Sequence, residues 1–438
     1  MTIVAPTSIR LIAVVAAVLL TSSVGGAQSA GDLPTRREFR GLFGPTAARQ
    51  ERPRRLDLMF SVYDAQDDDS YLATETDVLG PTLQAGEWYS GATAALTYGQ
   101  RRRHSQLTLN AASAARYYPG LQRLMGMRHS GGVDLDVYTA RDWRVQAAGT
   151  AIFSPFYQVV LGPSTGTAWL NETAPPNDDF SVSEQQAMQY GSTVGVSHTY
   201  GAKSAMNVNY VLRYNQVLDG GPDSSNQRIG GLYTRLLTRN VGLRLGYAYG
   251  VATYSGDAAA VPIRNQDLDL GLSYGRAFAP SSGLSVSFST GSTIVSSADG
   301  RHFRLIGTGR LVKQLSAQWT GQINYDRGLQ VPDGATRPFF SDTVGVNLKG
   351  YLNRRVSVRI QPNYSHGVVG FAGDTNSYDS VSSSMRLDVA MSRRVALYGE
   401  YFYYKYQFAS ADGLPGLLTM GLKRQGARFG LTLWAPVR

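Results

Sequence analysis

The chain has no cysteine, few histidines and a low fraction of charged residues. Without cysteine, its 438 residues form no disulfides and no thiolate metal sites. The histidines lie far apart and lack the spacing of paired metal ligands: His104, His129, His198, His302 and His366. Charged residues make up 17% of the chain, whereas soluble domains carry about 25%. We therefore expect no metal and no other cofactor, and the composition is unusual for a soluble protein.

Long apolar runs are absent except near the start of the chain. Arg10 precedes an apolar run over residues 11–20, and small residues follow through Ala30. This run is too short to cross a bilayer, and its order of charged, apolar and small regions predicts a signal peptide over residues 1–30, cleaved after Ala27 or Ala30. Because no second long apolar segment follows, a helical membrane protein is excluded.

The arginine-rich segment 31–53 comes next. Its polarity favours a disordered periplasmic leader over a folded plug. No linker divides residues 54–438, so we expect one domain there. In an exported chain the net charge of +10 gives no support for nucleic-acid binding. It favours attraction to anionic lipid, lipopolysaccharide or acidic glycans.

Alternation of apolar and polar residues runs through nearly all of residues 54–434. In the segment 204–215, apolar residues such as Leu212 alternate with polar ones such as Arg213, and 241–250 and 315–326 repeat the pattern. A strand sends successive side chains to opposite faces, so each of these segments predicts a two-faced strand. The 48 glycines and 26 tyrosines fit a membrane barrel, with small residues in its wall and aromatic girdles at the two interfaces. Alternation alone also allows a soluble sandwich.

The lengths of the connections favour the barrel, because short and long ones alternate. Tight turns are expected at Gln100–His104, Arg141–Asp142, Gly201–Lys203, Arg239–Asn240, Ala279–Gly283, Lys313–Gln314, Asn353–Arg354 and Ser392–Arg393. Longer loops are expected near 65–78, 119–128, 159–188, 218–226, 255–263, 297–301, 328–339, 370–376 and 409–423. Short periplasmic turns and long outer loops are typical of outer-membrane barrels. The sequence thus predicts an all-β, antiparallel up-and-down transmembrane β-barrel of about 18 strands, with both termini in the periplasm.

The first strands also carry a family resemblance. They contain the run from Leu56 to Asp64 (LDLMFSVYD), the acids Asp67 to Asp69, and the strands LTLNAASAARYYP and HSGGVDLDVYTARDWRV. From Asp57 to Tyr157 the chain resembles the outer-membrane β-barrel porins of the second type, and the layout persists to Trp434. The resemblance implies a barrel and a channel, and some members of that group are linked to exopolysaccharide export.

A barrel of this size leaves an aqueous channel, and the charges on its polar face would set the selectivity. Arginine is the commoner charge there and suits carboxylate, sulfate or phosphate groups. The alternative is that these charges pair across neighbouring strands. The expected pore-lining residues are Arg116, Arg144, Arg213, Arg244, Arg304, Arg359, Arg386, Arg428, Asp134, Asp136, Asp269, Asp326, Asp388 and Glu400.

The segment 159–188 is the longest connection and the third outer loop. By resemblance to general porins it would fold into the pore as a constriction loop, with its acids facing the arginines; the alternative is an extracellular flap. The residues expected to act there are Trp169, Glu172, Asp178, Asp179 and Glu184.

These observations predict an outer-membrane channel for diffusion or export of hydrophilic solutes, anionic or saccharide in nature. Inward tyrosines such as Tyr63, Tyr138 and Tyr398 would serve as stacking rungs for a sugar, whereas those near strand ends fit interfacial girdles. The expected partners are outer-membrane lipid, lipopolysaccharide and the barrel-assembly machinery. The alternatives are a non-conducting structural barrel and, less favoured, a barrel enzyme, for which Ser197-His198 and Ser365-His366 lack an identified third residue. No enzyme activity is expected.

Overall fold

The computed structural model describes most of the chain after residue 52. It describes residues 53–70, 88–119, 124–140, 142–154, 157–158, 181–183, 186–201, 203–218, 223–238, 241–255, 261–274, 284–297, 300–331, 337–371, 376–410 and 420–437. The predicted signal peptide (1–30) and almost all of the predicted leader (31–53) lie outside these residues. No helix in the described part of the chain is long and apolar enough to cross a membrane.

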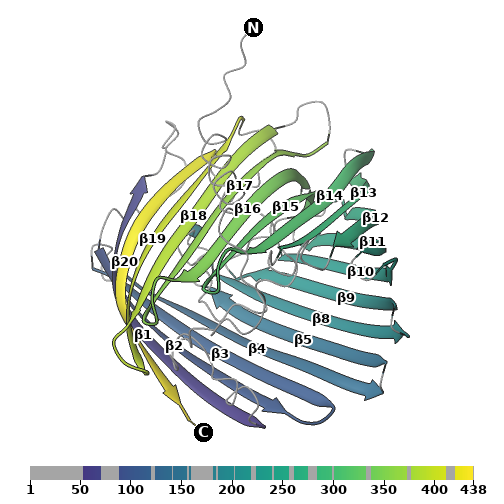
Figure 1. Cartoon of the computed structure of the whole chain (residues 1–438). Helices are drawn as coiled ribbons and strands as arrows, with labels where there is room; N and C mark the ends of the chain where they lie inside the picture. Colours follow the sequence, from purple (N-terminus) through teal and green to yellow (C-terminus); the bar gives the residue numbers. More distant parts are fainter. Residues whose placement is uncertain are drawn as a thin grey trace.

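Long strands make up the fold (Figure 1). They are β1 (Arg54–Ser70), β2 (Trp88–Arg101), β3 (Ser105–Tyr118), β4 (Leu124–Ala140), β5 (Trp143–Ser154), β8 (Ala187–Tyr200), β9 (Ser204–Val217), β10 (Asp223–Leu236), β11 (Val241–Ser255), β12 (Ile263–Tyr274), β13 (Leu284–Ser297), β14 (Gly300–Gln314), β15 (Trp319–Gln330), β16 (Phe339–Tyr351), β17 (Val356–Val369), β18 (Asn376–Ala390), β19 (Val395–Phe408) and β20 (Gly421–Pro436). Two short strands, β6 (Tyr157–Gln158) and β7 (Ser181–Ser183), pair with each other outside this sheet.

The large sheet closes on itself. Each strand pairs antiparallel with the strands before and after it in the sheet, and β1 pairs with both β2 and β20. Met59 on β1, for example, lies opposite Ala95 on one side and Trp434 on the other. Closure leaves no free strand edge, so the backbone hydrogen bonds of the wall are satisfied within the sheet. The predicted 18-stranded antiparallel up-and-down barrel is confirmed.

Turn chemistry at one rim explains where several strands end. The Asn353 side chain accepts hydrogen bonds from the backbone N–H groups of Arg355 (2.8 Å) and Val356 (3.0 Å). The Ser392 hydroxyl accepts in the same way from Arg394 and Val395. Short side chains that bond to the backbone two or three residues later favour tight turns. We call this end of the barrel, which also holds Arg54 and Pro436, the turn rim, and the opposite end the loop rim.

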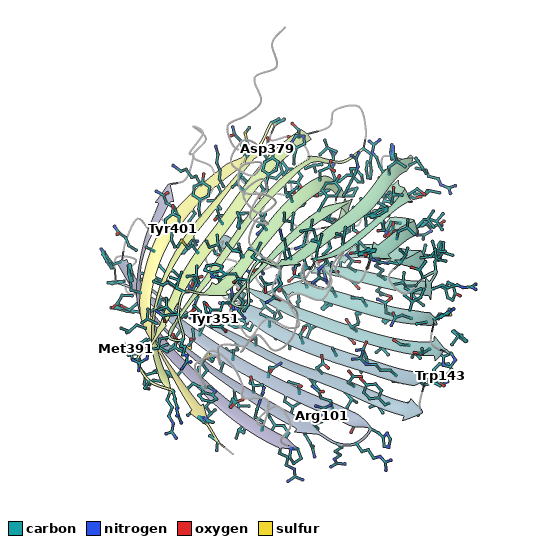
Figure 2. All side chains as sticks on the ribbon, viewed as in Figure 1. Arg101, Trp143, Tyr351, Asp379, Met391 and Tyr401 are labelled. Atoms are coloured by element: carbon teal, nitrogen blue, oxygen red, sulfur yellow. The ribbon has the colours of Figure 1, made fainter. Side chains whose placement is uncertain are left out.

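Figure 2 labels Met391, Arg101 and Trp143 along the turn rim, and Asp379 near the loop rim. All four residues lie close to the end of a strand.

The predicted strict alternation of short and long connections is wrong in detail. Ser297 pairs directly with Gly300, so the connection expected to be long near 297–301, at the loop rim, is a tight one. The turn expected at Ala279–Gly283 lies outside the described residues. Gly300 takes a positive φ of 107°, a conformation that glycine adopts without steric cost. The predicted strand order is nevertheless correct, because each connection still joins neighbouring antiparallel strands.

The turn predicted at Lys313–Gln314 is also displaced. β14 continues through Gln314, and the chain turns over residues 315–318, where the Leu315 N–H donates to the Trp319 carbonyl at 2.9 Å. The side chains of Gln314 and Ser316 both bond to the backbone of this turn. The predicted strand from 315 to 326 therefore begins only at Trp319.

Candidate functional site

The two faces of the barrel wall differ in exposure. On β1, Ser61, Tyr63 and Ala65 are buried, whereas Phe60 and Val62 are 43% and 40% exposed. In a closed barrel the convex outer surface is the more exposed one, so the buried series points inward. Because directly paired residues point to the same face, the register carries this assignment from strand to strand around the ring.

By this register, all the charged residues predicted to line a pore lie on the inner face, spread over β3–β5, β9, β11, β12, β14, β15 and β17–β20. They are Arg116, Arg144, Arg213, Arg244, Arg304, Arg359, Arg386, Arg428, Asp134, Asp136, Asp269, Asp326, Asp388 and Glu400. Leu212, Leu245, Trp319 and Val358 lie on the outer face.

Cysteine labelling checks the two faces directly. A membrane-impermeant maleimide is expected to react faster with Arg213→Cys than with Leu212→Cys, because only residue 213 faces the inside of the barrel. The two positions are neighbours on β9 at the same depth, so each serves as the control for the other. Equal labelling rates would show that the assignment of the inner and outer faces is wrong.

Several inner-face charges pair across strands, as the structural alternative expected. Arg144 bonds to Asp136 on the neighbouring strand, with its Nε donating at 2.6 Å. Arg244 lies 3.8 Å from Asp269. The Glu400 carboxylate accepts a hydrogen bond from Arg386 at 3.5 Å, and it lies 3.9 Å from the Arg428 guanidinium. These pairs hold charged side chains along the wall, and they leave the inner face hydrophilic.

Further inner-face charges were missed from the sequence: Asp57, Arg128, Arg228, Asp267, Arg310, Lys349 and Arg424. Arg228 on β10 reaches past β11 to Asp267 on β12, with 2.6 Å between nitrogen and oxygen. The residues of β11 that lie between them are Ala248 and Gly250, whose small size leaves room for this pair. Strict alternation would have placed Arg228 inward, but only the structure shows its partner two strands away.

An arginine–aromatic wall covers β1–β3 and β18–β20. We define it as Tyr63, Tyr89, Arg116, Arg386, Tyr398, Phe402 and Arg428. The Arg428 guanidinium lies 5.3 Å from the centre of the Tyr63 ring and 5.4 Å from that of the Phe402 ring. Arg386 lies 4.1 Å from the centre of the Tyr398 ring, and Arg116 lies 5.5 Å from that of Tyr89. Cation–π contacts of this kind orient guanidinium groups without neutralising their charge.

Glycines on the inner face let these tyrosines lie flat against the wall. A Cβ at Gly91 would sit 2.3 Å from the Tyr63 ring, and one at Gly430 would sit 2.6 Å from the Tyr398 ring. Both glycines are direct register partners of the tyrosines that cover them. The rings therefore occupy the space of the missing side chains instead of projecting toward the barrel axis.

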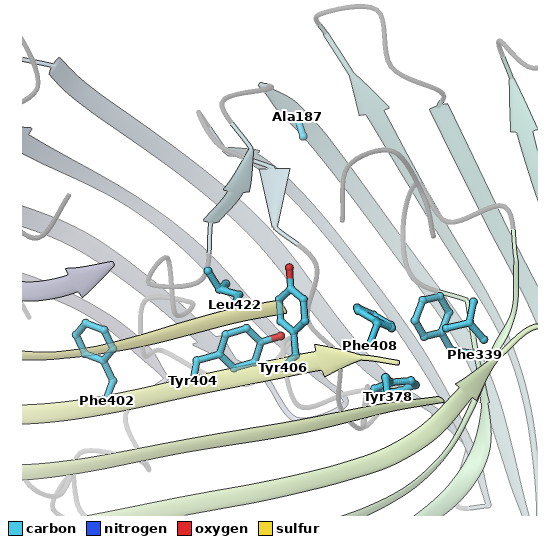
Figure 3. Close-up of a cluster of buried hydrophobic side chains, with 9 residues drawn as sticks. Ala187, Phe339, Tyr378, Phe402, Tyr404, Tyr406, Phe408 and Leu422 are labelled. Carbon is cyan, nitrogen blue, oxygen red and sulfur yellow. The ribbon is translucent and has the colours of Figure 1, made fainter. Parts of the chain in front are cut away.

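A second aromatic group lies nearer the loop rim, on β16–β20. Phe339, Tyr378, Tyr404, Tyr406 and Phe408 are at most 2% exposed, and they belong to one buried cluster (Figure 3). The Tyr404, Tyr406 and Phe408 rings follow one another along the inner face of β19, with ring centres 5.7 Å and 5.6 Å apart. This sector of the inner face is closed to water.

Amides and hydroxyls dominate the remaining inner wall, from β8 to β18. Asn207 donates to Ser197 at 2.7 Å, and Gln322 donates to Asn324 at 2.8 Å. Gln322 and Asn324 lie on the same strand, whereas Ser289 with Thr308, Thr343 with Ser365, and Asn363 with Ser382 bond across neighbouring strands, as Asn207 and Ser197 do. Such groups both donate and accept, so they match water and the hydroxyls of a polar solute.

The serine–histidine neighbours do not form catalytic pairs. Ser365 lies on the inner face, whereas His366 lies on the outer face and contacts Asp379 at 3.0 Å. Ser197 points inward, and the His198 ring lies on the outer face, tilted by 31° against the Trp143 ring with 4.2 Å between the ring centres. Among the described residues no cluster of three or more potential metal ligands is present. The residues expected in a constriction loop, Trp169, Glu172, Asp178, Asp179 and Glu184, lie outside the described residues.

No protein-family model and no curated protein matches this chain. Similar solved structures include OccK11 (OpdR) from Pseudomonas aeruginosa, with 10% sequence identity and a TM-score of 0.44 over 88% of this chain and 96% of that one. OccAB3 from Acinetobacter baumannii has 10% identity and a TM-score of 0.46 over 88% and 99%. The FrpB iron transporter from Neisseria meningitidis has 7% identity and a TM-score of 0.46 over 86% and 66%. Identities this low assign neither a solute nor residue roles.

Proposed function

We propose that the chain forms an outer-membrane, porin-like channel for hydrophilic solutes, with a preference for anions. The outer face supports the membrane location. Large apolar side chains stand exposed around the barrel, among them Leu268 (60%), Phe288 (54%), Leu305 (60%) and Phe429 (67%). An apolar surface that encircles the whole barrel is stable against lipid but not against water. The signal peptide predicted over residues 1–30 agrees with export to this membrane.

The chemistry of the inner face supports a channel. It holds amides, hydroxyls and charged groups, and basic residues outnumber acidic ones among its described strands. An 18-stranded barrel is wide enough to enclose water. A wall with an excess of positive charge, backed by low-dielectric lipid, concentrates anions inside. The partners that fit this arrangement are small anionic or saccharide solutes in the lumen and lipopolysaccharide around the barrel. We also propose that the barrel-assembly machinery of the outer membrane inserts this protein.

Planar-bilayer recording tests the proposal. The purified protein is expected to produce discrete conductance steps, and a salt gradient at neutral pH is expected to give a reversal potential of anion-selective sign. A folded barrel without conductance would favour the non-conducting structural barrel. Conductance with cation selectivity would retain the channel and reject the anion preference.

A further inference from the structure

Three basic side chains lie in one cross-strand row on the inner face. Lys349 on β16 is the register partner of Arg359 on β17, which is the register partner of Arg386 on β18. Like charges placed directly opposite each other destabilise a sheet, so the row needs an opposing charge. Arg386 has two acidic partners, Asp388 at 3.0 Å and Glu400 at 3.5 Å. Within the described part of the chain, Lys349 and Arg359 have none.

The next inner-face row toward the loop rim consists of neutral hydrogen-bonding groups. Asn347 and Gln361 stand two residues away from Lys349 and Arg359, and therefore on the same face. Gln361 is the register partner of Ser384, and Asn347 that of Gln322. Among the described residues, the side chains of Asn347 and Gln361 make no hydrogen bond. Both half-buried amides therefore remain available to a solute.

The next inner-face row toward the turn rim contains tyrosine rings. Tyr351, labelled in Figure 2, is the register partner of Ser357, and Ser357 lies opposite Asp388. Asp388 in turn lies opposite Tyr398. Strands lie about 4.8 Å apart, and same-face residues follow each other at about 6.7 Å along a strand. Three strands (β16–β18) and three rows (amide, cationic and aromatic) therefore form a patch of about 10 Å by 13 Å.

We propose that this patch on β16–β18 binds an acidic saccharide, with its carboxylate between Lys349 and Arg359 and its hydroxyls at Asn347 and Gln361. A guanidinium and an ammonium group suit a carboxylate. Amides donate and accept at once, as sugar hydroxyls do, and a tyrosine ring supplies an apolar face for the sugar ring. A simple inorganic anion would use the cations but not the amides. This inference rests on the proposed channel, and it names the class of solute that the channel recognises.

Current-block titrations in planar bilayers test the site with three probes. Galacturonate presents both the charge and the hydroxyls, galactose only the hydroxyls, and acetate only the charge. For the wild-type protein, the concentration that blocks half of the current is expected to be at least about tenfold lower for galacturonate than for galactose or acetate. A charge-assisted hydrogen bond raises affinity by roughly tenfold or more. The variant Lys349→Gln/Arg359→Gln is expected to lose this advantage, with little change toward galactose. Asn347→Ala/Gln361→Ala is expected to reduce the preference for galacturonate over acetate.

Arg213→Gln/Arg304→Gln is the matched control. It removes two positive charges from the inner faces of β9 and β14, away from the patch. If this control weakens block by galacturonate as much as Lys349→Gln/Arg359→Gln does, general charge and not a site is responsible, and the inference fails. An unchanged galacturonate-to-acetate ratio in the amide variant would also overturn it. Calorimetric titration of the detergent-solubilised barrel with galacturonate measures the site even without conductance, so failure of the channel and failure of the site give different results.

Discussion

Leu245→Arg is expected to lower the free energy of unfolding of the barrel by about 2–4 kcal/mol, the cost of placing an arginine in the apolar interior of a bilayer. Leu245 lies on the outer face of β11 and is 45% exposed. Its register partners there, Tyr233 and Leu270, offer no carboxylate to the new charge. Urea titration of the protein refolded into phospholipid vesicles measures the difference between variant and wild type.

Leu232→Arg is the matched control for this experiment. Leu232 is a leucine on the neighbouring strand β10, but its register partner Gly246 places it on the inner face. An arginine there meets water and the carboxylate of Asp269, the register partner of Gly246 on β12, so we expect a loss of less than about 1 kcal/mol. Equal losses at Leu232 and Leu245 would contradict a lipid-facing outer surface.

Gly291→Ala is expected to destabilise the barrel by about 3 kcal/mol, the upper range for overpacking in a rigid interior. Gly291 lies on the inner face of β13, and a Cβ there would sit 1.9 Å from the Leu268 carbonyl oxygen of β12. The obstacle is backbone, which cannot rotate away as a side chain does. The two strands would have to separate locally and lose hydrogen bonds, and thermal unfolding in detergent reports the loss.

Gly231→Ala provides the comparison for the glycine test. Gly231 lies on the outer face of β10, and no heavy atom lies within 4 Å of a Cβ placed there. Alanine at such a position reduces the freedom of the unfolded chain, so stability is expected to stay the same or to rise by about 0.5 kcal/mol. If both glycine variants were equally stable, the close approach of β12 and β13 would be refuted.

The fold could be predicted because each strand carries its own signal. On β9, Leu212 and Arg213 already separate an outer from an inner face, and the same period of two recurs on the following strands. The exact turns were harder to predict. The turn between β14 and β15 lies at residues 315–318 because Gln314 and Ser316 bond to its backbone, a local competition that alternation does not express.

The sequence by itself determined which residues share a face of each strand, because successive side chains of a strand point to opposite faces. The connections between these segments predicted about 18 strands. Only the tertiary structure decided which inner residues meet. Ser61 bonds to Thr432 at 3.2 Å across 371 positions of sequence, and Arg428 lies over the ring of Tyr63. The row of Lys349, Arg359 and Arg386 exists only in the observed register. Register depends on the closure of the whole ring, and a shift between two strands would bring together other residues of the same chemical kind.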